Sequence, residues 1–124
     1  MSRILVVEDD ANLRVVIRMV LERAGHEVAE ARHGAAALEA IDTSMPDLVL
    51  ADRTMPVMNG LELIERVRSN PVTAPLPIIL LSGMQVDAAV SRRIQAVVLK
   101  PFEPADLVAT IEGALHDDSG ELLT

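Results

Sequence analysis

The sequence contains no cysteine, which excludes disulfide bonds, thiolate metal sites and cysteine nucleophiles. It has no tryptophan or tyrosine and one phenylalanine, Phe102, so no aromatic platform is available for stacking the bases of single-stranded nucleic acid. No apolar run approaches membrane-spanning length, and the acidic Glu8 comes too early for a signal-peptide core. These absences predict a cytoplasmic protein that folds without covalent cross-links.

Positive charge is also scarce, with 11 basic residues against 19 acidic ones and a formal net charge of -8. This surplus repels nucleic acid and anionic membranes, which argues against direct binding to either. At 124 residues the chain has the length of one domain with a buried core. We expect a domain at residues 1–116 and a polar tail at 117–124.

Short apolar runs alternate with helix-like segments, which predicts an α/β fold with a parallel sheet and helices on both faces. The strands are expected at residues 4–7, 27–31, 48–51, 78–81 and 96–99, and the helices at 13–24, 35–41, 61–67, 86–94 and 104–115. Gly25 is placed to end the first helix, whose expected apolar face includes Val16. Asn59 and Glu62 have the spacing of a capping box before the third helix.

The segment that connects the fourth and fifth predicted strands is short. Only thirteen residues, 83–95, remain for the loop, helix and turn between the fourth and fifth strands. A parallel crossover needs about a dozen residues, so we expect the fourth helix to be short or irregular.

Charged and hydroxyl residues directly follow four of the predicted strands: Glu8 with Asp9, Asp52, Ser82 and Lys100. Ligands of open α/β sheets bind at the C-terminal ends of the strands, so we expect these side chains to gather there. Three crowded carboxylates repel one another, and a hard divalent cation such as Mg²⁺ would relieve that repulsion. A phosphoryl group would find metal, ammonium and hydroxyl groups around its oxygens.

Several motifs together resemble the receiver domain of two-component response regulators. They are Ile-Leu-Val-Val-Glu-Asp-Asp at 4–10, Met-Pro and Asn-Gly after Asp52, Ser-Gly at 82–83 and Lys-Pro-Phe at 100–102. The resemblance covers residues 3 to about 115. It implies a flavodoxin-like, five-stranded parallel sheet of order 2-1-3-4-5.

The resemblance also implies a metal site. Asp9, Asp52 and the backbone carbonyl of Thr54 would bind Mg²⁺ directly, and Glu8 would act mostly through bound water. Hard oxygen ligands and retained waters are what Mg²⁺ prefers in proteins.

The same resemblance implies that Asp52 accepts a phosphoryl group from a sensor histidine kinase or a phosphotransfer protein. Lys100 would pair with the phosphoryl oxygens, Ser82 would move to hydrogen-bond one of them, and the Lys100-Pro101 peptide would be cis. The protein would catalyse only its own phosphorylation and dephosphorylation, and would switch an interaction surface for an unnamed downstream protein.

One position departs from the family pattern, because receivers commonly carry an aromatic residue three positions before the lysine, and this chain has Val97 there. Together with the short fourth helix, this suggests that a partner is recognised by another face or by the tail. The three histidines, His26, His33 and His116, lack metal-ligand spacing and are interpreted as ordinary loop or helix-end residues.

Two other functions are compatible with part of the pattern. A phosphatase of the haloacid dehalogenase type also uses an aspartate nucleophile and Mg²⁺, but it usually has a second aspartate two residues later, where this chain has Thr54. A receiver fold that serves as a phosphorylation-independent scaffold is the main alternative.

Overall fold

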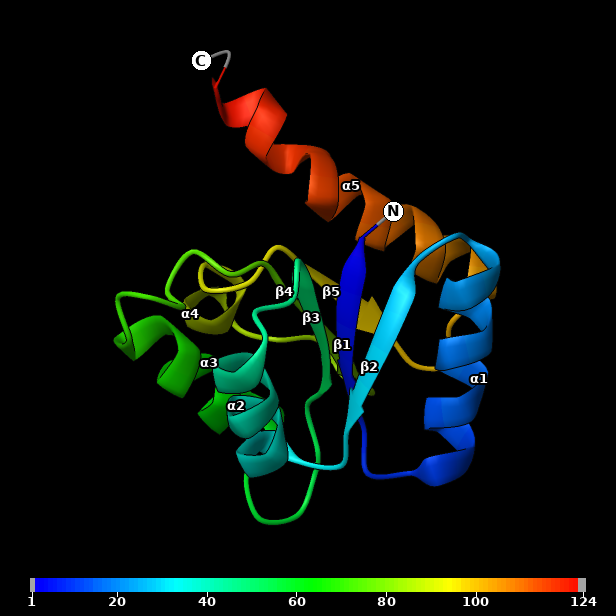
Figure 1. The fold of residues 1–124 in the computed structure, drawn as a ribbon, viewed down its shortest axis with the longest axis horizontal. Coiled ribbons are helices and arrows are strands. Elements are labelled where there is room, and N and C mark those ends of the chain that lie inside the picture. Colours follow the sequence, from blue (N-terminus) through cyan, green and yellow to red (C-terminus); the bar gives the residue numbers. More distant parts are fainter. Residues whose placement is uncertain (1, 123–124) are drawn as a thin grey trace.

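Strands and helices alternate along the chain in the computed structural model, which describes residues 2–122 (Figure 1). The strands are β1 (Arg3–Val7), β2 (Glu27–Ala31), β3 (Leu48–Asp52), β4 (Ile78–Ser82) and β5 (Ala96–Leu99). The helices are α1 (Ala11–Arg23), α2 (Gly34–Thr43), α3 (Gly60–Ser69), α4 (Ala88–Ser91) and α5 (Pro104–Leu122). The predicted order of elements is confirmed.

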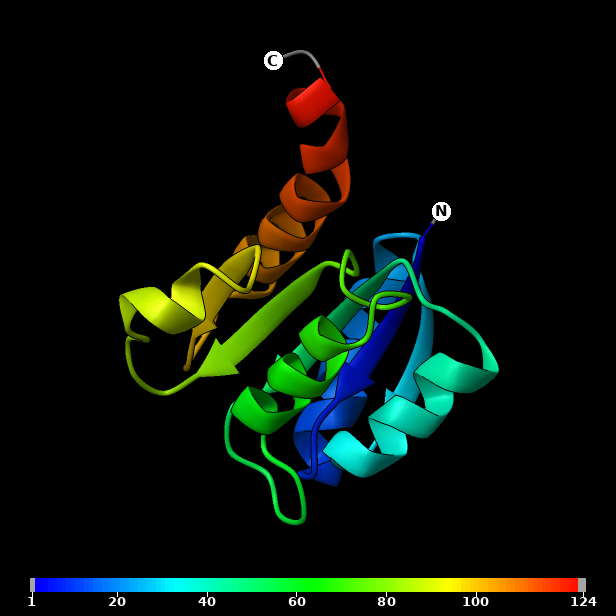
Figure 2. The ribbon, with the colours of Figure 1, turned by 90° about the vertical axis from the view of Figure 1, so that its left-hand side faces the viewer.

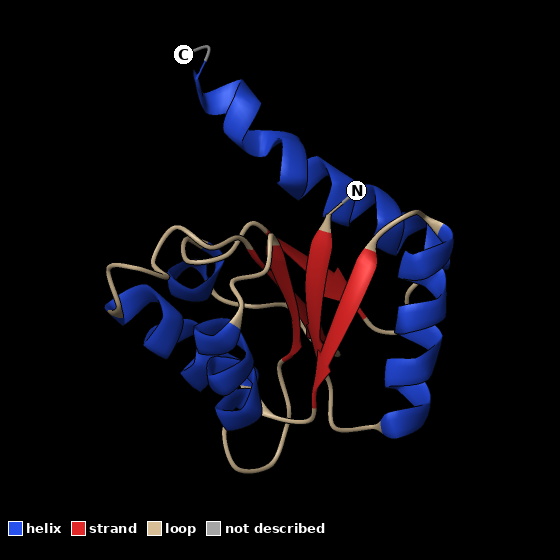
Figure 3. Ribbon diagram, in the orientation of Figure 1, coloured by secondary structure: helices blue, strands red, loops and turns tan. Residues whose placement is uncertain are grey.

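The strands form one parallel sheet of order β2-β1-β3-β4-β5, which confirms the expected topology. Figures 1 and 3 show α2, α3 and α4 on one face of the sheet and α1 and α5 on the other, and Figure 2 shows the same arrangement from the side. In the register, Val7 lies beside Ala51, and Ser82 lies beside Leu99. The residues that follow these strands therefore emerge at the same edge.

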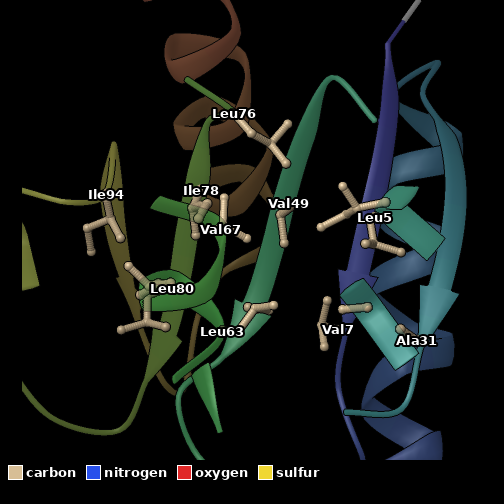
Figure 4. Close-up of a cluster of buried hydrophobic side chains, with 14 of the residues drawn as sticks. Leu5, Val7, Ala31, Val49, Leu63, Val67, Leu76, Ile78, Leu80 and Ile94 are labelled. Carbon is tan, nitrogen blue, oxygen red and sulfur yellow. The ribbon is translucent and has the colours of Figure 1, made fainter. Parts of the chain in front are cut away.

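Two apolar layers hold the helices against the sheet, because alternate residues of a strand point to opposite faces. Leu5, Val49 and Leu80 pack with α2 and α3 in one cluster, where Figure 4 shows Leu63 and Val67 of α3 beside the strands. The adjacent strand residues Ile4, Leu50 and Leu81 point to the other face. There they form the second cluster with side chains of α1 and α5, which are Ile17, Leu21, Leu107 and Ile111. The central strands are buried on both faces, as their continuous apolar runs predict.

Side-chain caps fix the starts of two helices near the C-terminal edge of the sheet. The Asp10 carboxylate accepts hydrogen bonds from the Asn12 and Leu13 amides at 2.9 and 3.2 Å. Asn59 and Glu62 form the expected capping box of α3. Gly25 follows α1 with φ of +93°, a conformation that favours glycine and ends the helix as predicted.

Two details of the helices differ from the sequence-based expectation. Val16 was assigned to the apolar face of the first helix, but its side chain is 48% exposed, because only Ile17 and Leu21 of α1 are buried. The last helix also continues to Leu122, past its expected end at residue 115, and residues 123–124 of the predicted tail lie outside the described residues. Polar composition does not end a helix, and no proline interrupts this stretch.

The fourth helix has the expected short form. It comprises the four residues Ala88–Ser91, with Asp87 as its N-cap. None of the helices in the described part of the chain is long and apolar enough to cross a membrane.

Candidate functional site

Three polar residues are buried among the residues whose exposure is described, and all three lie at or just after the end of a strand. Glu8 follows β1 and is 1% exposed, Asp52 ends β3 at 4%, and Ser82 ends β4 at 1%. Buried carboxylates are rare without a charge partner or a metal. Their position at the C-terminal edge of the sheet makes this edge the candidate site.

Lys100, which follows β5, supplies the cation of the site. Its Nζ atom donates a hydrogen bond to Asp52 Oδ2 at 2.7 Å and lies 3.8 Å from Glu8 Oε1. Burial lowers the pKa of Lys100, but the hydrogen bond and charge of Asp52, with the charges of Glu8 and Asp9, outweigh it and raise the pKa overall. The peptide between Lys100 and Pro101 is cis, as the resemblance implied.

The carboxylates of Glu8, Asp9 and Asp52 form a tight cluster, with one oxygen of each within 4.8 Å of the others. The Asp10 amide donates to Glu8 Oε2 at 3.1 Å, but Glu8 Oε1 is buried without a hydrogen-bond partner. Burial is the main cause that raises the pKa of Glu8 to about 8, and the adjacent Asp52 carboxylate raises it further. The cluster therefore has more negative charge than Lys100 alone can balance.

The donor set fits a hard divalent cation. Its oxygens come from carboxylates, one of them has no hydrogen-bond partner, and burial together with the nearby Asp52 carboxylate opposes ionisation of Glu8 in the absence of a cation. Mg²⁺ is bound through one or two carboxylates and several waters, which a cluster of two buried acids and one exposed acid permits. The exposed member here is Asp9.

The loops after β3 and β4 hold two further site groups. The Thr54 amide donates to Asp52 Oδ1 at 3.1 Å, which fixes the carboxylate from the side opposite Lys100. The Ser82 hydroxyl donates to the Met84 carbonyl at 2.6 Å and accepts from the Met84 amide at 3.1 Å. The structure thus brings Glu8, Asp9, Asp52 and Lys100 together, while the Ser82 hydroxyl is hydrogen-bonded to the backbone of Met84 in the loop that follows it.

Arg14 is a supporting residue that sequence reasoning missed. Its Nη1 atom donates to the backbone carbonyl of Glu8 at 2.7 Å, and its Nε atom pairs with Glu30 at 2.7 Å. It therefore ties the loop that carries Glu8 and Asp9 to α1 and β2. A lone arginine on a helix carries no sequence signal for such a backbone contact.

Gly60 allows the start of α3 to approach Asp52. A Cβ atom at this position would lie 2.5 Å from the Asp52 carbonyl oxygen and 2.9 Å from Arg53 Cα, both backbone atoms. Only glycine fits this close approach.

Gly60→Ala is therefore expected to lower the free energy of unfolding by about 2–3 kcal/mol, because the backbone that carries Asp52 must shift. Urea unfolding measures the change. Gly83→Ala, at the same edge, is the matched control, because a Cβ there meets nothing within 4 Å. Equal stability of the two variants would contradict the close approach.

Comparisons with known proteins identify the family. A family model described as the response regulator receiver domain matches residues 4–112. A chemotaxis protein CheY homolog of Campylobacter jejuni is 35% identical over 125 residues, which cover 96% of this chain and 96% of that protein. The high-resolution structure of the chemotaxis response regulator CheY4 of Vibrio cholerae superposes with a TM-score of 0.83 at 28% identity, covering 92% of this chain and 98% of that one.

A second kind of relative is longer. The phosphate regulon transcriptional regulatory protein PhoB of Pseudomonas aeruginosa is 34% identical over 120 residues, which cover 91% of this chain but 51% of that protein. The chain thus spans about half the length of PhoB and nearly the whole length of the chemotaxis relative. Fold, family model and relatives agree, and the chain belongs to the response regulator receiver domains of two-component signalling.

Proposed function

We propose that Asp52 is the phosphoacceptor of this receiver domain and that its phosphorylation switches a protein-interaction surface. The observation that carries the proposal is the pairing of a buried carboxylate with Lys100 at 2.7 Å, beside two further acids. Aspartate is an established nucleophile for phosphoryl groups, and this transfer needs mainly alignment and charge neutralisation.

Asp52 would attack the phosphorus atom of a phosphohistidine on a sensor kinase or a phosphotransfer protein. The new O–P bond forms as the P–N bond breaks, and the departing imidazole nitrogen keeps the electron pair. Lys100 holds the Asp52 carboxylate and would pair with the transferred oxygens. Glu8, Asp9, Asp52 and the Thr54 carbonyl would hold Mg²⁺, which supplies positive charge to the phosphoryl oxygens.

The signal would begin at Ser82. In the structure described here its hydroxyl is bonded to Met84. A phosphoryl group on Asp52 would compete for that hydroxyl and draw the loop after β4 toward the site. Because α4 has only four residues, we infer that the downstream partner reads this loop and its surroundings rather than a long α4 face.

A phosphorylation-independent scaffold is the weaker alternative. It gives no reason for a buried carboxylate oxygen of Glu8 without a partner, or for three acids within 4.8 Å of one another. A scaffold would be more stable with apolar residues in these positions.

Mass spectrometry tests the proposed function directly. Incubation with phosphoramidate and MgCl₂ is expected to add one phosphoryl group to the chain, and chelation of Mg²⁺ should abolish the reaction. Asp52→Asn should prevent the modification, while Asp42→Asn, an exposed acid on α2, should leave it unchanged. Absence of modification in the wild-type protein would favour the scaffold function, and turnover of many phosphate esters would favour a hydrolase.

A further inference from the structure

A second concave site lies at the opposite edge of the sheet from Asp52. This cavity of about 700 Å³ is lined by residues that precede β2, β3 and β4 and by the second half of α5. Its polar lining includes His26 from the turn after α1, Asp47 before β3, and Glu112 and His116 of α5. The phosphoacceptor chemistry uses none of these residues.

His26 is the unusual member of this lining. Its side chain is 8% exposed, and neither ring nitrogen has a hydrogen-bond partner in the described part of the chain. Glu112 Oε2 lies 3.5 Å from His26 Nε2, which is within ion-pair distance but does not form a hydrogen bond. Buried polar groups almost always have a partner, so an imidazole left this way beside a carboxylate indicates a missing ligand.

The distance between these two atoms suits a shared metal ion. Nitrogen and oxygen ligands bind zinc at about 2.0–2.2 Å in tetrahedral geometry, which places two ligand atoms about 3.4 Å apart. The observed separation of His26 Nε2 and Glu112 Oε2 is 3.5 Å. The pair is therefore already spaced for coordination of one ion.

A third donor is available from the same helix. His116 lies four residues after Glu112 in α5, and residues at this spacing are neighbours on one face of a helix. In the structure its ring nitrogens do not lie within 4.8 Å of both members of the pair, but the side chain is exposed at the cavity and is free to turn toward them. Asp47 is less suited to coordination, because its Oδ2 atom already accepts the Arg3 amide at 2.7 Å.

We propose that His26, Glu112 and His116 bind a zinc-class divalent cation that fastens α5 to the turn between α1 and β2. Two imidazoles and one carboxylate favour zinc over Mg²⁺, and a water would complete the tetrahedron. The spacing of the histidines in the sequence gave no hint of this site, because His26 and His116 are 90 residues apart and only the fold brings them to one cavity.

Isothermal titration of the metal-free protein with ZnCl₂ tests the site. Excess MgCl₂ is present throughout, so that zinc does not compete for the acidic cluster at the other edge. One zinc ion per chain is expected to bind, and the midpoint of thermal unfolding should rise with the zinc concentration, because a ligand of the native state stabilises it.

Two variants distinguish zinc bound at this cavity from zinc bound elsewhere on the chain. His26→Gln and His116→Gln should each weaken zinc binding at least about tenfold. Mutation of residues that only hydrogen-bond to a metal ligand already has an effect of this size, so loss of a ligand itself should cost no less. His116 is exposed, so its replacement leaves folding intact. His33→Ser, which keeps a capping side chain at the start of α2, is the histidine control and should bind normally. A zinc affinity that stays unchanged in either of the first two variants, or that falls only in Asp52→Asn, would overturn the proposal.

Discussion

Lys100→Met is expected to slow phosphorylation of Asp52 by about 10²–10³-fold, the usual effect of removing one charge-stabilising donor from a transfer site. Lys100 is the only lysine of the chain, and its Nζ atom lies 2.7 Å from Asp52 Oδ2. The variant should also lose about 2–4 kcal/mol of stability, because the nearly buried Asp52 carboxylate loses its partner. Rates follow from mass spectrometry of timed samples with phosphoramidate, and stability follows from urea unfolding.

Two further variants test whether the ion pair of Lys100 with Asp52 is the source of these effects. Lys100→Arg keeps the charge and should recover most of the stability, but little of the rate, because guanidinium geometry differs from that of an ammonium group. Lys100→Met with Asp52→Asn should be more stable than Lys100→Met alone, because no unpaired buried carboxylate remains. If the double variant were the less stable of the two, the ion pair would not be the source of the effect.

Most of the fold follows from local patterns. The strands are runs such as Leu48–Asp52 in which apolar side chains fill both faces of the sheet, and this pattern depends only on neighbouring residues. The caps at Asn59 and Gly25 act within one turn of their helices, so they were predictable as well. The short length of α4 was predicted from the number of residues available for the crossover between β4 and β5.

Contacts between residues that are distant in the sequence could not be predicted as well. The strand-end rule placed Asp52 and Lys100 at one edge, but their 2.7 Å contact depends on the paths of two loops. The absence of a hydrogen-bond donor near Glu8 Oε1 depends on how the neighbouring side chains are arranged in the folded chain. Val16 shows the same limit, because helical spacing cannot say how wide a stripe the sheet and α5 will cover.

Arg68 illustrates a stabilising role that no motif reveals. Its guanidinium donates to the carbonyls of Ala74, Leu76 and Arg93, at 2.8, 2.6 and 2.9 Å. These contacts join the end of α3 to the segment before β4 and to the turn before β5. They hold the segments that lead into β4 and β5 against the end of α3.

The raised pKa of Glu8 makes the metal-free protein sensitive to pH. In the folded chain this pKa is about 8, mainly because the carboxyl group is buried, against 4.5 for an unperturbed glutamate side chain. Between these two values the folded chain keeps a proton on Glu8 that the unfolded chain releases. Stability from this group is therefore fully present below about pH 4.5 and is lost as the pH rises toward 8.

Glu8→Gln is expected to remove most of that loss, because an amide does not ionise. Relative to the wild-type protein, the variant should gain on the order of 3 kcal/mol between about pH 5 and 8 in the presence of a chelator. Urea unfolding over this range measures the difference, with Glu39→Gln as a control because Glu39 is exposed on α2. Mg²⁺ should stabilise the wild-type protein at high pH more than the variant, since cation binding favours the ionised carboxylate. A constant difference between wild type and Glu8→Gln across the range would show that the Glu8 carboxyl group has the same affinity for protons in the folded and unfolded chains.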